Sequence, residues 1–196
     1  MLILASQSPR RREILHMLGY AFDCRPAHAD ETIPAGTPPE KAVELLAERK
    51  ALAARLTAEE TDTVLGSDTV VVLDGAILGK PTDKSDAARM LQALSGRTHT
   101  VYTGVALLQA DQKILFHDRA AVTFYPLDDA EIAAYIATGE PMDKAGAYGI
   151  QGRGSALVEG IHGDFFTVMG LPAGKTVRAL RQMGVYPVDE TLYTRS

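Results

Sequence analysis

A chain of 196 residues with 46% hydrophobic and 23% charged side chains has the composition of a soluble globular protein with one sizeable core. Its net charge of −5 argues against broad binding to nucleic acids or to anionic membranes. A single cysteine, Cys24, excludes an intrachain disulfide, and no apolar run approaches the roughly 20 residues of a membrane span, so we expect a cytoplasmic setting.

The N-terminal residues predict a buried strand that leads directly into a helix. Residues 2–5 form an apolar run, and Ser8 and Pro9 suit the N-cap and the first position of a helix that ends before Gly19. Residues 10–12 are all arginine and occupy the first turn, where the helix dipole favours negative charge. Because a strand-to-helix turn binds anions and guanidinium groups match phosphate oxygens, we predict a phosphate site here.

Helical spacing separates the three arginines. At about 100° per residue, Arg11 falls near the middle of the apolar stripe that runs from Ile14 to Leu18. Arg10 and Arg12 lie roughly 100° to either side of it. We therefore expect Arg11 to turn inward toward a bound phosphate or nucleotide, and Arg12 to face solvent.

The rest of the chain alternates between strand and helix patterns. Strands are predicted at residues 22–25, 63–73, 76–78, 98–108, 114–125 and 156–158. Helices are predicted from a capping-box-like start at residues 37–40 to residue 56, at 83–94, at 128–137, and from 172 to 183. Loops are predicted at residues 26–39 and in the glycine-rich stretch 139–154. We expect an α/β fold, a mixed central sheet flanked by helices, as a single domain over residues 1–196.

Asp68 interrupts the strongest predicted strand. Together with Ser67 and Thr69 it separates two apolar runs within residues 63–73. A carboxylate in that position is costly unless it is paired, hydrogen-bonded or bound to a metal. Asp68 is therefore either satisfied by neighbouring backbone N–H groups or lines a functional cleft, and we favour the cleft.

Four further residues are candidates for the site only in combination with Asp68. Lys50 lies in a charged helical segment typical of a solvated face, and Lys80 ends a hairpin, as many surface lysines do. Glu31 can supply a second oxygen ligand, because Mg²⁺ is commonly held by one or two carboxylates and the substrate phosphates. Gln151 follows several glycines and offers both a donor and an acceptor to the edge of a base.

These segments occur in an order that resembles the Maf family of nucleoside triphosphate pyrophosphatases. The motifs are LASQSPRR at residues 4–11, LGSDTVV at 65–71, GKP at 79–81, LSGRTH at 94–99, DKAGAYGIQG at 143–152 and GLP at 170–172. The resemblance covers essentially the whole chain. It implies hydrolysis of a nucleoside triphosphate to the monophosphate and pyrophosphate with a divalent cation, Mg²⁺ or Mn²⁺. It also implies a fold like that of inosine triphosphate pyrophosphatases, elongated with a central cleft, and a homodimer.

The resemblance assigns roles to individual residues. Asp68 matches the catalytic carboxylate, described in the family as a proton acceptor, and Glu31 matches an acidic site residue that can share a metal with it. The positions that handle phosphates are matched by Ser6, Arg11, Lys50 and Lys80.

The same comparison separates two branches of the family. Enzymes acting on dTTP and UTP carry Arg, Thr and Gln where this chain has Arg11, Thr69 and Gln151. The branch that prefers 7-methyl-GTP lacks this set, so the chain is similar to the first branch. The chain departs from the residues that are more common in the family at Gln7, Ser67 and Met169. None of these three positions is assigned a chemical role.

Other functions remain open at this point. The family name came from septum inhibition, so a regulatory protein that senses nucleotides without turnover is one alternative, and a 7-methyl-GTP pyrophosphatase is another. A phosphotransferase is disfavoured, because no G-x-x-x-x-G-K-[ST] loop occurs. We expect an enzyme that cleanses the nucleotide pool, with a link to arrest of cell division as a further implication of the resemblance.

Overall fold

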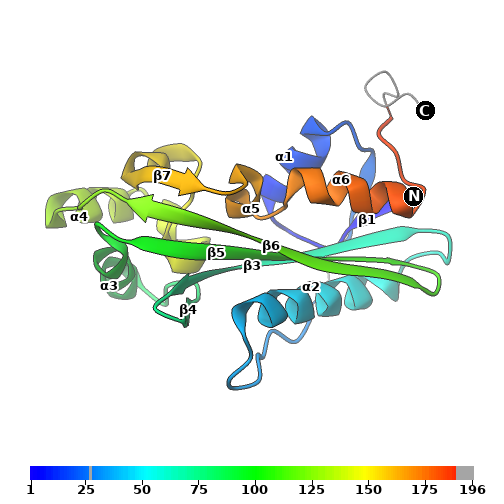
Figure 1. The fold of residues 1–196 in the computed structure, drawn as a ribbon, viewed down its shortest axis with the longest axis horizontal. Coiled ribbons are helices and arrows are strands. Elements are labelled where there is room, and N and C mark those ends of the chain that lie inside the picture. The colour runs from blue at the N-terminus through cyan, green and yellow to red at the C-terminus, as the bar shows by residue number, and fades with distance from the viewer. Residues whose placement is uncertain (27, 189–196) are drawn as a thin grey trace. The chain divides into compact units, whose positions relative to one another are not determined.

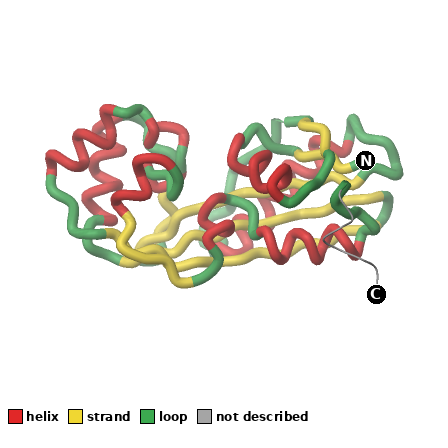
Figure 2. Tube along the Cα trace, turned by 90° about the horizontal axis from the view of Figure 1, so that it is seen from above, coloured by secondary structure: helices red, strands yellow, loops and turns green. Residues whose placement is uncertain are grey.

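The computed structural model describes residues 1–26 and 28–188. Its strands are β1 (Leu2–Leu4), β2 (Phe22–Cys24), β3 (Thr63–Leu73), β4 (Ala76–Leu78), β5 (Thr98–Gln109), β6 (Gln112–Phe124) and β7 (Val158–His162) (Figure 1). Its helices are α1 (Pro9–Met17), α2 (Pro39–Arg55), α3 (Lys84–Leu94), α4 (Asp129–Ala137), α5 (Phe165–Met169) and α6 (Ala173–Gln182). Three short 3₁₀ segments, η1 (Glu140–Asp143), η2 (Ala145–Ala147) and η3 (Gly152–Leu157), follow α4. Figure 2 shows the helices in red and the strands in yellow along the Cα trace. Within the described ranges, no helix is both long enough and apolar enough to span a membrane.

The strands form a mixed sheet, as predicted. Their order is β2-β1-β3-β5-β6-β7, with β4 paired to β3 beside this path. β1 is parallel to both β2 and β3, whereas the β3–β4 and β6–β7 pairs are antiparallel. Asp74 and Gly75 join β3 to β4 with φ values of 51° and 80°, the positive values that a tight hairpin turn requires. The predicted mixed α/β class is therefore confirmed.

Most predicted elements are present, and the errors are local. Residues 156–157 were predicted to begin a strand, but they belong to η3, and β7 begins at Val158. The five-residue helix α5 was not predicted, because its length is below what a periodic pattern can reveal. The glycine-rich stretch after α4, predicted as a loop, contains the three 3₁₀ segments.

Of two predicted helix caps, one has the predicted residue and the other does not. Ser8 occupies the N-cap position of α1, but its side chain makes no capping hydrogen bond. The N-cap of α2 is Pro38, which has no side-chain acceptor, while the Thr37 hydroxyl donates to the carbonyl of Pro34. Proline within the first turn of both helices presets the backbone and removes one donor that would need a partner. The capping box occurs instead at α4, where Asp128 and Glu131 satisfy each other's backbone N–H groups.

The chain divides into two compact units. Among the described residues, unit 1 comprises residues 1–68, 103–118 and 170–188, and unit 2 comprises residues 69–102 and 119–169. Strand β3 continues from unit 1 into unit 2 between Asp68 and Thr69. The expectation of one domain over residues 1–196 stays a prediction.

In unit 1, the backbone of helix α2 contacts the backbone of the sheet directly at two glycines, Gly66 and Gly104. A Cβ built on Gly66 of β3 would lie 2.2 Å from the carbonyl oxygen of Ala47, and one on Gly104 of β5 would lie 2.2 Å from that of Val43. Only glycine fits at such distances, so the helix backbone rests directly on the strands. The apolar cluster around this contact is made of small and branched side chains: Ile3, Ala5, Ala47, Ala51, Ala54, Val64, Ala106 and Leu108.

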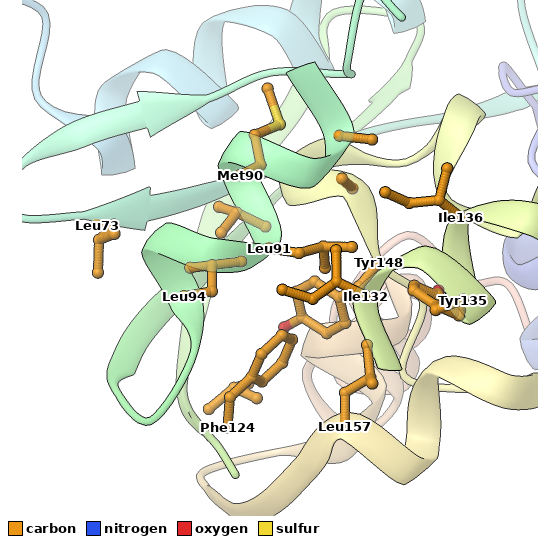
Figure 3. Close-up of a cluster of buried hydrophobic side chains, with 14 of the residues drawn as sticks. Leu73, Met90, Leu91, Leu94, Phe124, Ile132, Tyr135, Ile136, Tyr148 and Leu157 are labelled. Atoms are coloured by element: carbon orange, nitrogen blue, oxygen red, sulfur yellow. The ribbon is translucent and has the colours of Figure 1, made fainter. Parts of the chain in front are cut away.

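Unit 2 has its own core, formed between α3, α4 and the strands (Figure 3). At its centre the rings of Phe124 and Tyr148 meet edge to face with centroids 4.7 Å apart, and His99 lies edge-on to both. His99 Nε2 is 2.7 Å from the Tyr148 hydroxyl. Burial lowers the pKa of His99 to about 4 and raises the pKa of Tyr148, so both groups are neutral near pH 7.

Candidate active site

Arg11 is fixed at the start of α1 by two hydrogen bonds within unit 1. Its Nε donates to the carbonyl of Gly170 at 2.8 Å, and its Nη1 donates to Ser6 Oγ at 3.0 Å. The Ser6 hydroxyl also accepts from the backbone N–H of Ser8 at 3.2 Å. Arg11 is half-buried and Arg12 is exposed, which agrees with the orientation expected from the helical stripe. The strand-to-helix turn therefore holds the guanidinium of Arg11 in one place.

Arg11 is a partly buried cation near the acidic Asp68. Burial lowers the pKa of Arg11 to about 10, an effect that the charge of Asp68 opposes and that of neighbouring Arg10 reinforces. At this pKa the guanidinium stays protonated at neutral pH. A partly desolvated cation attracts an anion more strongly than one in open water.

The carbonyl of Gly170 was not singled out from the sequence, yet it organises this part of unit 1. It accepts from Ser67 Oγ at 3.0 Å as well as from Arg11 Nε. Gly170 has a φ of 112°, which favours glycine, and Ser67 is completely buried. The GLP motif and the Ser67 departure were visible in the sequence, but nothing linked them across 103 residues.

Asp68 is paired with the ammonium group of Lys50. Lys50 Nζ on α2 is 2.5 Å from Asp68 Oδ1 on β3 and 2.9 Å from Glu31 Oε1. The side chains of Lys50 and Asp68 are 18% and 13% exposed, whereas that of Glu31 is 64% exposed. A single cation thus joins a nearly buried carboxylate to one at the surface.

The direct packing of α2 explains why Lys50 reaches Asp68. Successive strand residues point to opposite faces, so Gly66 and Asp68 share the face that α2 covers, and Ser67 points to the other face, toward Gly170. Since Gly66 has no side chain, α2 comes close enough for Lys50 to reach the carboxylate two positions further along the strand.

The loop that carries Glu31 is also attached to α2. Arg49 Nη1 donates to the carbonyl of Asp30 at 3.1 Å and to that of Thr32 at 2.7 Å. Asp30 Oδ1 accepts from the backbone N–H of Thr32 at 2.9 Å, a contact that spans Glu31. Consecutive residues of α2, Arg49 and Lys50, therefore hold the loop and its carboxylate.

The acidic groups suit a cation that is shared with a ligand. Within residues 1–26 and 28–188, no group of three His, Cys, Asp or Glu side chains is placed to enclose a metal. Glu31 and Asp68 nevertheless converge on one ammonium group. Two carboxylate oxygens completed by phosphate oxygens and water are a usual ligand set for Mg²⁺. The residues present thus fit a divalent cation that arrives with a phosphate ligand.

The other three residues proposed from the sequence belong to unit 2. Thr69 is half-buried on β3, directly after Asp68. Lys80 is exposed and follows Gly79, whose carbonyl accepts from the N–H of Gly146 at 3.0 Å. Gln151 is half-buried and precedes η3. The structure therefore brings Ser6 to Arg11, and Glu31 and Lys50 to Asp68, within unit 1.

The chain is similar to a protein family and to individual known proteins. A family model described as Maf-like protein matches residues 1–183. The dTTP/UTP pyrophosphatase of Moorella thermoacetica is 54% identical over 187 residues, which are 94% of this chain and 95% of that protein. The dTTP/UTP pyrophosphatase of Bacillus pumilus is 50% identical over 187 residues, 95% of this chain and 98% of that protein. A crystal structure of a nucleoside-triphosphatase, a dITP/XTP pyrophosphatase from Mycobacterium abscessus, matches with a TM-score of 0.44 and 13% identity, covering 92% of this chain and 94% of the other.

Proposed function

This chain belongs to the family of Maf-like proteins, and on that premise we propose that it hydrolyses dTTP and UTP to the monophosphate and pyrophosphate. The relatives that are about half identical to it carry the name dTTP/UTP pyrophosphatase. The structural observation that carries the proposal is the contact of Lys50 with Asp68 and Glu31. Asp68 also acts electrostatically on Arg11, the residue that we predict to bind phosphate.

The proposed reaction is attack of water on the α-phosphorus of the triphosphate. Asp68 accepts a proton from the attacking water, the bond from the α-phosphorus to the bridging oxygen breaks, and pyrophosphate leaves with the electron pair of that bond. The side chain of Asp68 is only 13% exposed, so its carboxylate is largely shielded from bulk water. The reaction leaves a monophosphate and pyrophosphate as its two products.

Positive charge is the second contribution of the protein. Arg11, fixed by Ser6 and Gly170, and the lysines Lys50 and Lys80 are proposed to bind the phosphate oxygens. Charge that builds up on the leaving group is stabilised best by cations that are already in place. Arg11 meets this requirement, because both of its described hydrogen bonds go to unit 1 itself.

A divalent cation is part of the proposal. Glu31 and Asp68 would hold Mg²⁺ or Mn²⁺ together with the phosphates, and the ion would supply further positive charge to the phosphate oxygens. Lys50 now bridges these carboxylates, so it would release at least one of them as the cation binds and then be available to a phosphate oxygen.

Base selection is assigned to Gln151, Thr69 and Arg11, the set that marks the dTTP/UTP branch. The amide of Gln151 can donate to and accept from the edge of a pyrimidine. A base that does not complete these hydrogen bonds leaves polar atoms of the protein unpaired, which weakens its binding.

A panel of nucleoside triphosphates tests the proposal directly. dTTP, UTP, CTP, ATP, GTP and 7-methyl-GTP are incubated at equal concentration with Mg²⁺, and with EDTA as control, and products are separated. We expect monophosphate and pyrophosphate from dTTP and UTP well ahead of the others, and none with EDTA. Diphosphate and phosphate would indicate different chemistry, tight binding without products would indicate a sensor, and equal rates for all would reject the proposed selectivity.

A further inference from the structure

We propose that Glu140, together with Tyr135, is a positioning residue that holds Gln151 for base selection. This inference rests on the proposed function of Gln151, and it concerns unit 2 only. Neither Glu140 nor Tyr135 was selected from the sequence.

The carboxylate of Glu140 is surrounded by hydrogen-bond donors from the segment that follows it. Its Oε1 accepts from the Tyr135 hydroxyl at 2.9 Å and from the N–H of Gly154 at 3.1 Å, and its Oε2 accepts from the N–H of Arg153 at 3.1 Å. These donors favour the charged form and hold the pKa of Glu140 below its usual value, although burial opposes them. Because its oxygens are occupied by these donors, Glu140 is suited to positioning the chain and not to reacting with a substrate.

Tyr135 extends the same network to the other side of Gln151. Tyr135 lies on the buried side of α4 (Figure 3). Its hydroxyl also accepts from the N–H of Gly149 at 3.1 Å. Glu140 therefore holds the backbone two and three residues after Gln151, and Tyr135 holds the backbone two residues before it. The chain between these points is fixed at both ends.

The glycines of this segment leave little room for it to shift. A Cβ on Gly154 would lie 2.2 Å from the carbonyl oxygen of Gly149, and one on Gly152 would lie 2.9 Å from Glu140 Oε2. Gly152 also has a φ of 67°, a conformation that favours glycine directly after Gln151. The backbone is wound closely around the carboxylate, and Gln151 stands half-buried on the resulting turn.

This arrangement has a functional consequence that packing alone would not require. A side-chain amide that selects a base has to be held within a fraction of an ångström of its partner, and a fixed backbone provides this before the substrate arrives. A charged anchor made of one carboxylate and several donors fixes geometry more sharply than apolar contacts do. We therefore expect loss of the anchor to affect selection of the base more than the chemical step.

Glu140→Gln is the first test, because the amide keeps the size of the side chain and replaces one acceptor by a donor. Whichever way the amide is oriented, its NH₂ group faces one of the N–H groups of Arg153 and Gly154. We expect the KM for dTTP to rise about tenfold, kcat to change less than about twofold, and the preference for dTTP over ATP in kcat/KM to fall about tenfold. Glu159→Gln, an equal charge change at an exposed position of β7, serves as the matched control and should keep the wild-type values.

A double-mutant cycle separates positioning of Gln151 from a general structural effect. Gln151→Ala should itself lower the preference for dTTP, and adding Glu140→Gln to it should change that preference by less than about twofold. If Glu140→Gln lowered the preference for dTTP as much in the Gln151→Ala background as in the wild-type protein, the inference would be overturned. It would also be overturned if the Glu140→Gln enzyme kept the wild-type preference, or if only its kcat fell.

Amide hydrogen exchange tests the anchor without any substrate. In Glu140→Gln, the amides of residues 149, 153 and 154 should exchange faster, while those in the centre of β3 stay protected. Tyr135→Phe, which removes the shared hydroxyl, should give the same local pattern if the Glu140 variant does not fold. Unchanged exchange in this segment would overturn the inference. Failure of the wild-type protein to hydrolyse dTTP or UTP would instead reject the proposed function, and the exchange result would still decide whether the anchor exists.

Discussion

Lys50 on α2 and Asp68 on β3 form a hydrogen-bonded ion pair, with 2.5 Å between Nζ and Oδ1. The same ammonium lies 2.9 Å from Glu31 Oε1. Asp68 is only 13% exposed, and a carboxylate this far from water needs a partner. Lys50 compensates its negative charge even without a ligand. The proposed catalytic carboxylate is thus part of a cluster that is already assembled in unit 1.

Replacing Asp68 by asparagine should stop turnover without unfolding the protein. The amide keeps the shape of the side chain but accepts no proton, so we expect pyrophosphate release to fall by roughly 10²–10⁴-fold. Lys50 retains its contact with Glu31, so the melting temperature should change by only a few degrees. Asp111→Asn, at an exposed turn, is the control. Pyrophosphate release at the wild-type rate in Asp68→Asn would contradict the assigned role.

Arg11→Ala should reduce activity far more than Arg12→Ala. Arg11 donates to Ser6 and to the Gly170 carbonyl, whereas Arg12 is exposed on the same helix. Loss of a fixed cation at the phosphates should lower kcat/KM by roughly 10²-fold, and loss of an exposed one by less than about threefold. Steady-state kinetics with dTTP measures both variants. Equal losses would show that charge in general, and not the position of Arg11, supports the reaction.

Adding a methyl group at Gly66 should separate Lys50 from Asp68. The new Cβ would lie 2.2 Å from the carbonyl oxygen of Ala47 and 2.7 Å from the N–H nitrogen of Ala51, so α2 has to move outward. We expect Gly66→Ala to lower the free energy of unfolding by about 1–3 kcal/mol, as overpacking commonly does, and to lower turnover as well.

Gly160→Ala is the matched control for this substitution, because a Cβ there meets no atom within 4 Å. Denaturant unfolding and pyrophosphate release are measured for both variants. A Gly66→Ala protein with full stability and full activity would show that the close approach of α2 is not needed.

The buried His99 should make stability depend on pH in mildly acidic solution. Its pKa is about 4 in the folded protein, because burial disfavours the charged form, against a usual value of 6.5. Between these values the unfolded chain binds more protons, so the free energy of unfolding falls as the pH is lowered from 6.5 toward 4. The full difference corresponds to about 3 kcal/mol.

His99→Gln removes this proton uptake and keeps a polar group near the Tyr148 hydroxyl. We expect its free energy of unfolding to depend less steeply on pH than that of the wild-type protein between pH 6.5 and 5, where carboxylates of ordinary pKa remain ionised. Chemical denaturation at several pH values measures both slopes. Parallel curves for the two proteins would contradict a depressed pKa for His99.

Much of the fold was predictable because its signals are local. The eleven-residue strand β3 is followed directly by the turn at Asp74 and Gly75, and both can be recognised from neighbouring residues in the sequence. The observed strand has the predicted bounds. The helix α1 also has nearly its predicted bounds, and the inward face of Arg11 followed from helical spacing alone. The errors lie where local signals are ambiguous: the capping box expected at the start of α2, whose N-cap is Pro38, and a short 3₁₀ segment at residues 152–157.

The sequence by itself determined the mixed α/β class, most element bounds and a set of residues whose chemistry suits a triphosphate. Only the tertiary structure decided which of these residues touch: Lys50 to Asp68 through the space left by Gly66, and Arg11 to the Gly170 carbonyl across 159 residues. The anchoring of the segment around Gln151 by Glu140 likewise depends on contacts up to 14 residues away. The reason is physical. Backbone preference and hydrophobic period act over a few residues, whereas the distance between two side chains on different elements is set by how closely those elements pack.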